Sequence, residues 1–141
     1  MSKEDFVSFE QAQKLKALGF VEETTHYYND DGTFEEQSIY IEPSLDGRAV
    51  SVSYVIDGGF NKHCSTAFDA PTLSQACKWL RSKGWAVQTY LIGTRTAYFA
   101  RVWKLEMNSD VVDVAGQFDT YEQAQSAGID VAIGLLEKGD K

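Results

Sequence analysis

Three segments of this chain begin in the same way, with a Ser or Thr followed three residues later by Gln. The pairs are Ser8 and Gln11, Thr72 and Gln75, and Thr120 and Gln123. In a capping box, the hydroxyl accepts a hydrogen bond from the third amide of a helix, and the Gln side chain returns one to the cap's own amide. The repeated pattern therefore predicts three helices. Gly19, Gly84 and Gly139 follow the three runs, and we expect a left-handed helix end at each.

The apolar spacing in two of these segments indicates which helix face is buried. In the second segment the i, i+3, i+4, i+7 positions are Leu73, Ala76, Cys77 and Leu80. The third segment has a broader stripe, so we expect it to be the most buried helix. That stripe consists of Tyr121, Ala124, Gly128, Val131 and Leu135, widened by Ile129, Ala132, Ile133 and Leu136. Because Gly128 and Gly134 each cost about 1 kcal/mol in a helix interior, we expect another backbone to approach them closely.

The segments between the predicted helices have the pattern of strands joined by tight turns. Turns at residues 29–32, 43–47 and 57–59 indicate a meander of about four antiparallel strands. A second hairpin turns at residues 93–96, and residues 111–114 add a short edge strand. The order is α, four strands, α, two or three strands, α. These observations predict an α+β fold in one domain over residues 1–141, with helices on one side of an antiparallel sheet.

The charges are unevenly distributed along the chain, which has a net charge of −8. Residues 70–105 contain no Asp or Glu but six of the thirteen Lys and Arg residues, so this window carries +6. The rest of the chain contains the other seven basic residues and all twenty-one acidic residues, so its net charge is −14. Because unspecific affinity for nucleic acid comes largely from Lys and Arg at phosphates, we expect no duplex nucleic acid as a partner.

Several other function classes lack their sequence signals. There is no run of about eighteen apolar residues and no basic-then-apolar leader, so we expect a soluble, cytoplasmic protein without a membrane partner. His26, His63, Cys64 and Cys77 have no paired ligand spacing, which argues against a metal site and a disulfide framework. No phosphate-binding glycine motif or nucleophile motif occurs, so we expect neither a cofactor nor an enzyme.

The second hairpin combines basic and aromatic residues and is the candidate site. If residues 94 and 95 form its turn, Tyr90 pairs with Phe99, Gln88 with Arg101 and Ala86 with Trp103 on one face. Aromatic planes beside an arginine suit base stacking and phosphate pairing. We therefore predict that this face binds an anionic ligand with a flat ring. The candidate ligand-binding residues are Gln88, Tyr90, Arg95, Phe99, Arg101 and Trp103, with Lys78 and Arg81 nearby.

Two other interpretations of the same residues stay open. Tyr90, Phe99 and Trp103 could pack under a helix with Arg101 reaching past them, or the face could bind a protein or a second copy of the chain. The acidic hairpin around residues 30–36 could bind a basic partner, although such charges are more often a solvated face.

The stretches "APTLSQACKWLRSKGW" and "YEQAQSAGIDVAIGLL", with the earlier "QAQKLKALGF", resemble small proteins of Bacteroides-type gut bacteria and their phages. That group has no assigned activity or site residues, so the resemblance implies only a phage or mobile-element product acting inside a bacterial cell. Such proteins without catalytic motifs often act by binding. The leading expectation is therefore sequestration of a nucleotide-like host defence signal. Inhibition of a host protein is the alternative, followed by a self-assembling, homo-oligomeric role.

Overall fold

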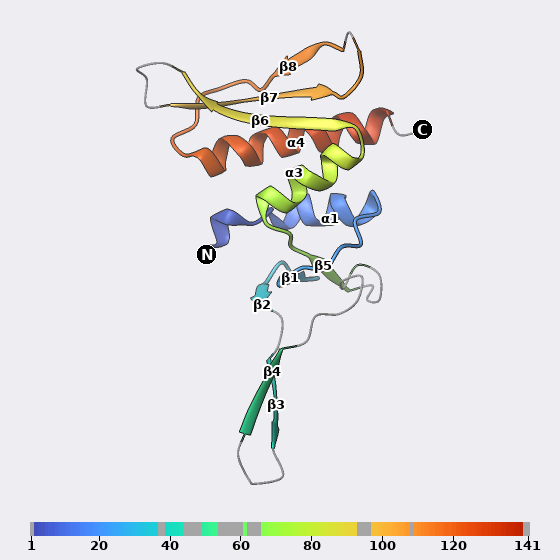
Figure 1. The fold of residues 1–141 in the computed structure, drawn as a ribbon, viewed down its shortest axis with the longest axis vertical. Helices are drawn as coiled ribbons and strands as arrows, with labels where there is room; N and C mark the ends of the chain where they lie inside the picture. The colour runs from blue at the N-terminus through green and yellow to red at the C-terminus, as the bar shows by residue number, and fades with distance from the viewer. Residues whose placement is uncertain are drawn as a thin grey trace.

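The computed structural model describes residues 2–36, 39–43, 49–53, 61, 66–92, 97–107 and 109–139, with the backbone path alone for residues 39–43 and 49–53. In chain order the elements are η1 (Lys3–Asp5), α1 (Phe9–Ala17), β1 (His26–Asn29), β2 (Phe34–Glu36), β3 (Ile39–Pro43), β4 (Ala49–Ser53), β5 (Ala67–Asp69), α3 (Leu73–Ser82), β6 (Trp85–Leu91), β7 (Tyr98–Lys104), β8 (Val111–Asp113) and α4 (Tyr121–Gly139). The helices lie in a layer between two three-stranded antiparallel sheets, and the β3–β4 hairpin extends beyond one of them (Figure 1). This arrangement confirms the predicted α+β class.

All three predicted helices begin where the pattern places them, but only the first forms the complete capping box. Ser8 Oγ accepts from the Gln11 amide at 3.1 Å, and Gln11 Oε1 accepts from the Ser8 amide at 2.8 Å. At the start of α3, Thr72 Oγ1 accepts from the Gln75 amide, whereas the Gln75 side chain donates to the carbonyl of Glu23 instead. The Gln75 side chain thus links α3 to the segment before β1 instead of closing the capping box.

The start of α4 is capped in a similar, incomplete way. Thr120 Oγ1 accepts from the Gln123 amide, while Gln123 Oε1 accepts from the amide of Asp119, one residue before the cap. At the helix ends, Gly19 and Gly84 have φ values of +97° and +94°, which confirms two of the predicted left-handed positions. The third prediction is wrong, because Gly139 lies within α4 and is not among the glycines with positive φ.

The buried face of α3 contains one residue more than the spacing predicts. Leu73, Ala76 and Leu80 are buried, and Cys77 is half-buried. Trp79 is only 5% exposed and packs edge-on against Phe20, with the ring centroids 5.6 Å apart. A large indole can turn into the core from the border of an apolar stripe, which is why the simple spacing misses it.

Helix α4 is the central helix, in contact with the β6–β7 hairpin, α3, α1 and η1. Its buried stripe is rotated from the predicted one, because Tyr121 is 45% exposed and Val131 and Leu135 are half-buried. The buried residues of α4 are Ala124, Gln125, Gly128, Ile129, Ala132, Ile133 and Leu136. A Cβ at Gly128 would lie 2.6 Å from Val87 Cγ1, so a side chain of the sheet, rather than another backbone, explains this glycine. Gly134 has nothing within 4 Å, and the same explanation is wrong there.

Five strands, not four, are described between α1 and α3, and they do not form one meander. The first sheet has the order β2–β1–β5, and β3 and β4 form a separate pair. Strand β5 returns to β1 and ends in the fully buried Asp69, which accepts from Thr24 Oγ1 and the Asn61 amide. A buried carboxylate is not a strand signal, so the sequence pattern does not reveal this strand.

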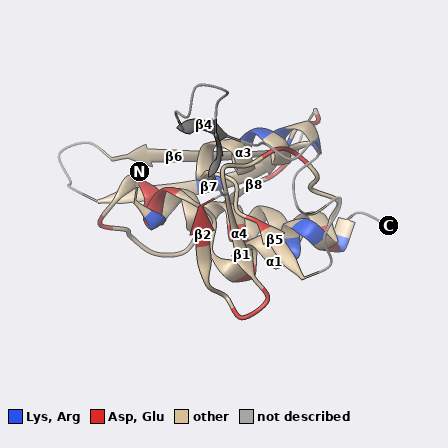
Figure 2. Cartoon of the chain, turned by 90° about the horizontal axis from the view of Figure 1, so that it is seen from below, with Lys and Arg blue, Asp and Glu red and all other residues tan. Residues whose placement is uncertain are grey.

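The turns of these segments are only partly within the described residues. Gly32 has a φ of +88° and its amide donates to the Asn29 carbonyl, which confirms the turn at residues 29–32. The acidic tip after β1 is drawn in red in Figure 2. The predicted turns at residues 43–47, 57–59 and 93–96 lie wholly or largely outside the described residues, as do His63 and Cys64.

Candidate functional site

The β6–β7 hairpin has the register that the sequence predicts. Tyr90 pairs with Phe99, Gln88 with Arg101 and Ala86 with Trp103. Strand β8 adds Asp113 opposite Arg101 and Val111 opposite Trp103. Because side chains alternate between the two faces of a strand, these residues share one face of the sheet. We call this surface the open face; it consists of Ala86, Gln88, Tyr90, Phe99, Arg101, Trp103, Val111 and Asp113.

Helices α3 and α4 lie on the opposite side of this sheet (Figure 1). There, Ala100 and Val102 are buried, and both approach Gly128 of α4. Trp85 and Val87 belong to the same core. In contrast, the half-buried rings of Tyr90, Phe99 and Trp103 are not among the residues packed against the core cluster. The described helices therefore do not cover the aromatic residues of the open face.

The aromatic residues of the open face are ordered by contacts with one another. The Tyr90 and Phe99 rings are nearly parallel, with an interplanar angle of 25° and centroids 5.8 Å apart. The guanidinium of Arg101 lies over the Tyr90 ring, with its Cζ 4.5 Å from the ring centroid. A guanidinium on an aromatic face is a favourable cation–π arrangement. The three side chains therefore form one stacked group across two strands.

Asp113 places a negative charge near the guanidinium of Arg101. The Arg101 Nε lies 4.0 Å from Asp113 Oδ1, too far for a hydrogen bond, and has no hydrogen-bond partner within the described structure. Interaction with the Tyr90 side chain, and to a smaller extent with the Asp113 carboxylate, raises the pKa of Arg101 above its ordinary value. At the end of β7, Lys104 pairs with Glu106 at 3.7 Å. The described part of this region is thus close to neutral, although the sequence window around it is basic.

The structure brings together five of the eight predicted site residues. Gln88, Tyr90, Phe99, Arg101 and Trp103 are all on the open face. The other three are elsewhere. Lys78 and Arg81 are exposed on α3, which packs on the opposite side of the sheet, and Arg95 lies outside the described residues.

Sequence reasoning missed the contribution of β8 to this surface. Val111 is 52% exposed, and the Asp113 side chain is 77% exposed. The sequence predicts a short edge strand at residues 111–114. Its register against β7 has no sequence signal, because the two strands are not joined by a tight two-residue turn. The sequence therefore indicates the strand but not the carboxylate opposite Arg101.

Other reactive groups in the described part of the chain do not form a second site of this kind. No cluster of three or more His, Cys, Asp or Glu side chains there is arranged to hold a metal ion. Burial raises the pKa of the Cys77 thiol, against the smaller, lowering effects of Gln125 and Arg81. The thiolate of Cys77 is thus disfavoured at neutral pH. None of the described helices has both the length and the hydropathy to cross a bilayer.

No protein-family model, curated protein or solved structure matches this chain. What the open face can do follows from its own side chains. They can stack flat groups, exclude water from apolar surface and donate hydrogen bonds from Arg101 and Gln88. None of the eight residues is a nucleophile paired with a general base.

Proposed function

We propose that this protein is a non-catalytic binding protein and that the open face binds another protein. The observation that carries the proposal is the group of large aromatic side chains and one arginine that no described helix covers. Tyr, Trp and Arg are the residue types most enriched among those that dominate binding energy at protein interfaces. On the open face Tyr90, Arg101 and Trp103 lie on two neighbouring strands.

The one-sided geometry of a sheet face and the charge beside Arg101 favour a protein over a small anion. Pockets for small ligands usually enclose most of the ligand surface, whereas a sheet face contacts a ligand from one side only. In addition, Asp113 already lies beside Arg101, so an anion would have to compete with a carboxylate that is 77% exposed. A suitable partner would present apolar side chains to Trp103 and Val111 and a hydrogen-bond acceptor to the exposed end of Arg101.

A nucleotide-like ligand is the second candidate, because the Tyr90 and Phe99 rings and the Arg101 guanidinium form one stacked group. Stacking of a base on such a group contributes about 1–3 kcal/mol per base. With a nucleotide-like ligand, the protein would act by sequestering a host defence signal. With a protein partner, it would instead inhibit a bacterial protein or associate with a second copy of the chain.

Contact-dependent crosslinking tests the protein candidate. A photoreactive benzoylphenylalanine replaces Phe99 on the open face in one variant and Glu137, which is exposed on α4, in a matched control. After irradiation of bacterial cells, we expect a discrete adduct from position 99 that the control does not give and that Arg101→Ala removes. An adduct with the mass of two chains would identify a second copy as the partner. Identical adduct patterns at both positions, or none at position 99, would contradict the proposal.

A thermal-shift panel separates the two candidates. The purified protein is heated with linear and cyclic nucleotides and with ADP-ribose derivatives, beside Arg101→Ala. A ligand that binds the folded state must raise the unfolding midpoint by mass action. We expect no shift across the panel. A shift that Arg101→Ala abolishes would support nucleotide sequestration and count against a protein partner.

A further inference from the structure

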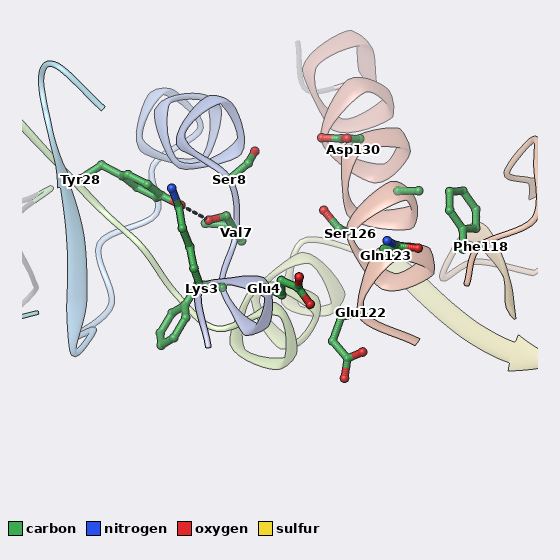
Figure 3. Close-up of a pocket in the computed structure, with 12 residues that line it drawn as sticks. Lys3, Glu4, Val7, Ser8, Tyr28, Phe118, Glu122, Gln123, Ser126 and Asp130 are labelled. Atoms are coloured by element: carbon green, nitrogen blue, oxygen red, sulfur yellow. Dashed lines mark hydrogen bonds between the residues drawn. The ribbon is translucent and has the colours of Figure 1, made fainter. Parts of the chain in front are cut away.

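A second surface, away from the open face, has the form of a groove. It lies between the N-terminal segment with β1 on one side and the first turns of α4 with Phe118 on the other (Figure 3). Its volume is about 680 Å³. The half-buried Phe118 and Ala127 supply accessible apolar surface. The buried side chains of Phe6, Val7 and Tyr28 form its floor, where the Tyr28 hydroxyl donates to the Val7 carbonyl at 2.7 Å. The groove is therefore mainly apolar inside, because the Tyr28 hydroxyl is already engaged in a hydrogen bond within the protein.

The rim of this groove is acidic. Glu4 points toward α4 from the N-terminal segment, and Glu122 and Asp130 stand on α4 (Figure 3). Within the described structure, none of these three carboxylates forms an ion pair. One of them has a hydrogen-bond partner, since Asp130 Oδ1 accepts from Gln11 Nε2 at 2.9 Å. The negative charges at the rim are thus not neutralised by the fold.

Lys3 is the one basic residue among the described residues that line the groove, and it does not offset these charges directly. Its Nζ lies 6.0 Å from the ring centroids of both Tyr28 and Phe34. In Figure 3 its side chain extends toward Tyr28 and away from Glu122. The charges at the rim of the groove therefore favour a positively charged ligand.

Helix chemistry explains only one of the three acids. Glu122 is in the first turn of α4, where a carboxylate interacts favourably with the helix dipole. Asp130 is two turns further on, where that effect has decayed. Glu4 is in the first turn of η1, but this 3₁₀ helix has three residues and therefore only a small dipole. The arrangement of the acids around an apolar slot is thus not a by-product of capping.

The spacing of the acids on α4 limits the shape of a ligand. Glu122 and Asp130 are eight residues apart, which corresponds to about 12 Å along the helix axis. In an extended peptide, side chains i and i+4 project to the same side about 13 Å apart, with side chain i+2 between them. We infer that the groove binds an extended segment of a partner protein with Lys or Arg at positions i and i+4 and a large apolar residue at i+2. The apolar side chain would enter the slot, and the two cations would meet the rim.

A titration with defined peptides tests this inference. The probe is the N-acetylated, C-amidated pentapeptide KSFSK, and its controls are ESFSE, with inverted charge, and KSSSK, without the apolar side chain. Binding is followed by amide chemical shifts of the ¹⁵N-labelled full-length protein. We expect KSFSK to shift residues 3–8 and 121–130, to bind more tightly than both controls and to weaken at higher salt.

Variants of the rim locate the binding site. Glu122→Gln should weaken the affinity for KSFSK about two- to fivefold, and the double variant Glu122→Gln/Asp130→Asn about tenfold. Asn at position 130 keeps an oxygen acceptor for Gln11, so the helix contact is retained. Glu137→Gln removes the same charge from an exposed site on α4 outside the groove and should leave the affinity unchanged. Equal binding of ESFSE, no shifts at millimolar KSFSK, or equal affinities of the rim and control variants would overturn the inference.

Discussion

Gly128 on α4 allows the central helix to pack closely against the β6–β7 hairpin, and Gly128→Ala tests this contact quantitatively. The added Cβ would lie 2.6 Å from Val87 Cγ1 and 3.4 Å from Ala100 Cβ. Ordinary carbon contacts are about 3.5–4.0 Å, so about 1 Å of overlap must be relieved. Val87 is β-branched and cannot swing its methyl group away freely. Overpacking of this kind costs about 1–3 kcal/mol, against about 1 kcal/mol gained from the better helix former.

Gly134→Ala is the matched control, because the same helix has open space at that position. It should raise the free energy of unfolding by about 0.5–1 kcal/mol. The difference between the two variants cancels the helix propensity and isolates the packing cost of about 1–3 kcal/mol. Urea unfolding followed by circular dichroism measures both. With an m-value of about 2 kcal/mol/M, the midpoints should differ by about 0.5–1.5 M.

A further substitution identifies the contact itself. Val87→Ala removes the methyl group that Gly128→Ala would meet, so the double variant should recover part of the lost stability as a coupling between the two sites. Equal stability of Gly128→Ala and Gly134→Ala, or no coupling with Val87→Ala, would refute the close-packing explanation.

Three further predictions concern the fold. Tyr28→Phe removes the hydrogen bond to the Val7 carbonyl and should lower the free energy of unfolding by about 1–2 kcal/mol, measured by urea unfolding. Ser8→Ala breaks the capping box of α1 and should cost about 1 kcal/mol in the same assay, while a change below about 0.3 kcal/mol would contradict the cap's role. Burial raises the pKa of the Cys77 thiol, so its stabilising contribution is fully present below the unfolded pKa and is lost as the pH rises through the raised, folded pKa. Wild type should therefore lose more stability than Cys77→Ala across that alkaline range, and parallel pH profiles of the unfolding free energy would contradict this.

The parts of the fold that the sequence predicts correctly are those set by local chemistry. The Ser8 cap and the left-handed Gly19 depend on neighbouring residues only, and both are confirmed. The register of β6 against β7 follows from a short connection and is confirmed from Tyr90 to Trp103. The predicted α+β class rests on the same local signals.

The parts that the sequence does not predict depend on contacts between distant segments. Strand β5 pairs with β1 across a long connection and includes the buried Asp69, which no strand pattern contains. The position of Asp113 beside Arg101 depends on the register of β8, and the groove requires η1 to meet α4. The position of Lys78 is likewise not predictable from the sequence. It is close to the hairpin along the chain, but it lies on α3 and not on the open face.

The aromatic residues of the open face are surface available for binding and not part of the core. The most direct measurement compares the unfolding free energies of Trp103→Ala and Trp79→Ala. Trp79 is 5% exposed within the core, so its loss should cost about 3–5 kcal/mol. Trp103 is half-buried and outside the core cluster, and its loss should cost about 1–2 kcal/mol while crosslinking from position 99 declines. An equal cost for the two tryptophans would mean that Trp103 is a core residue and that the open face is not available for binding.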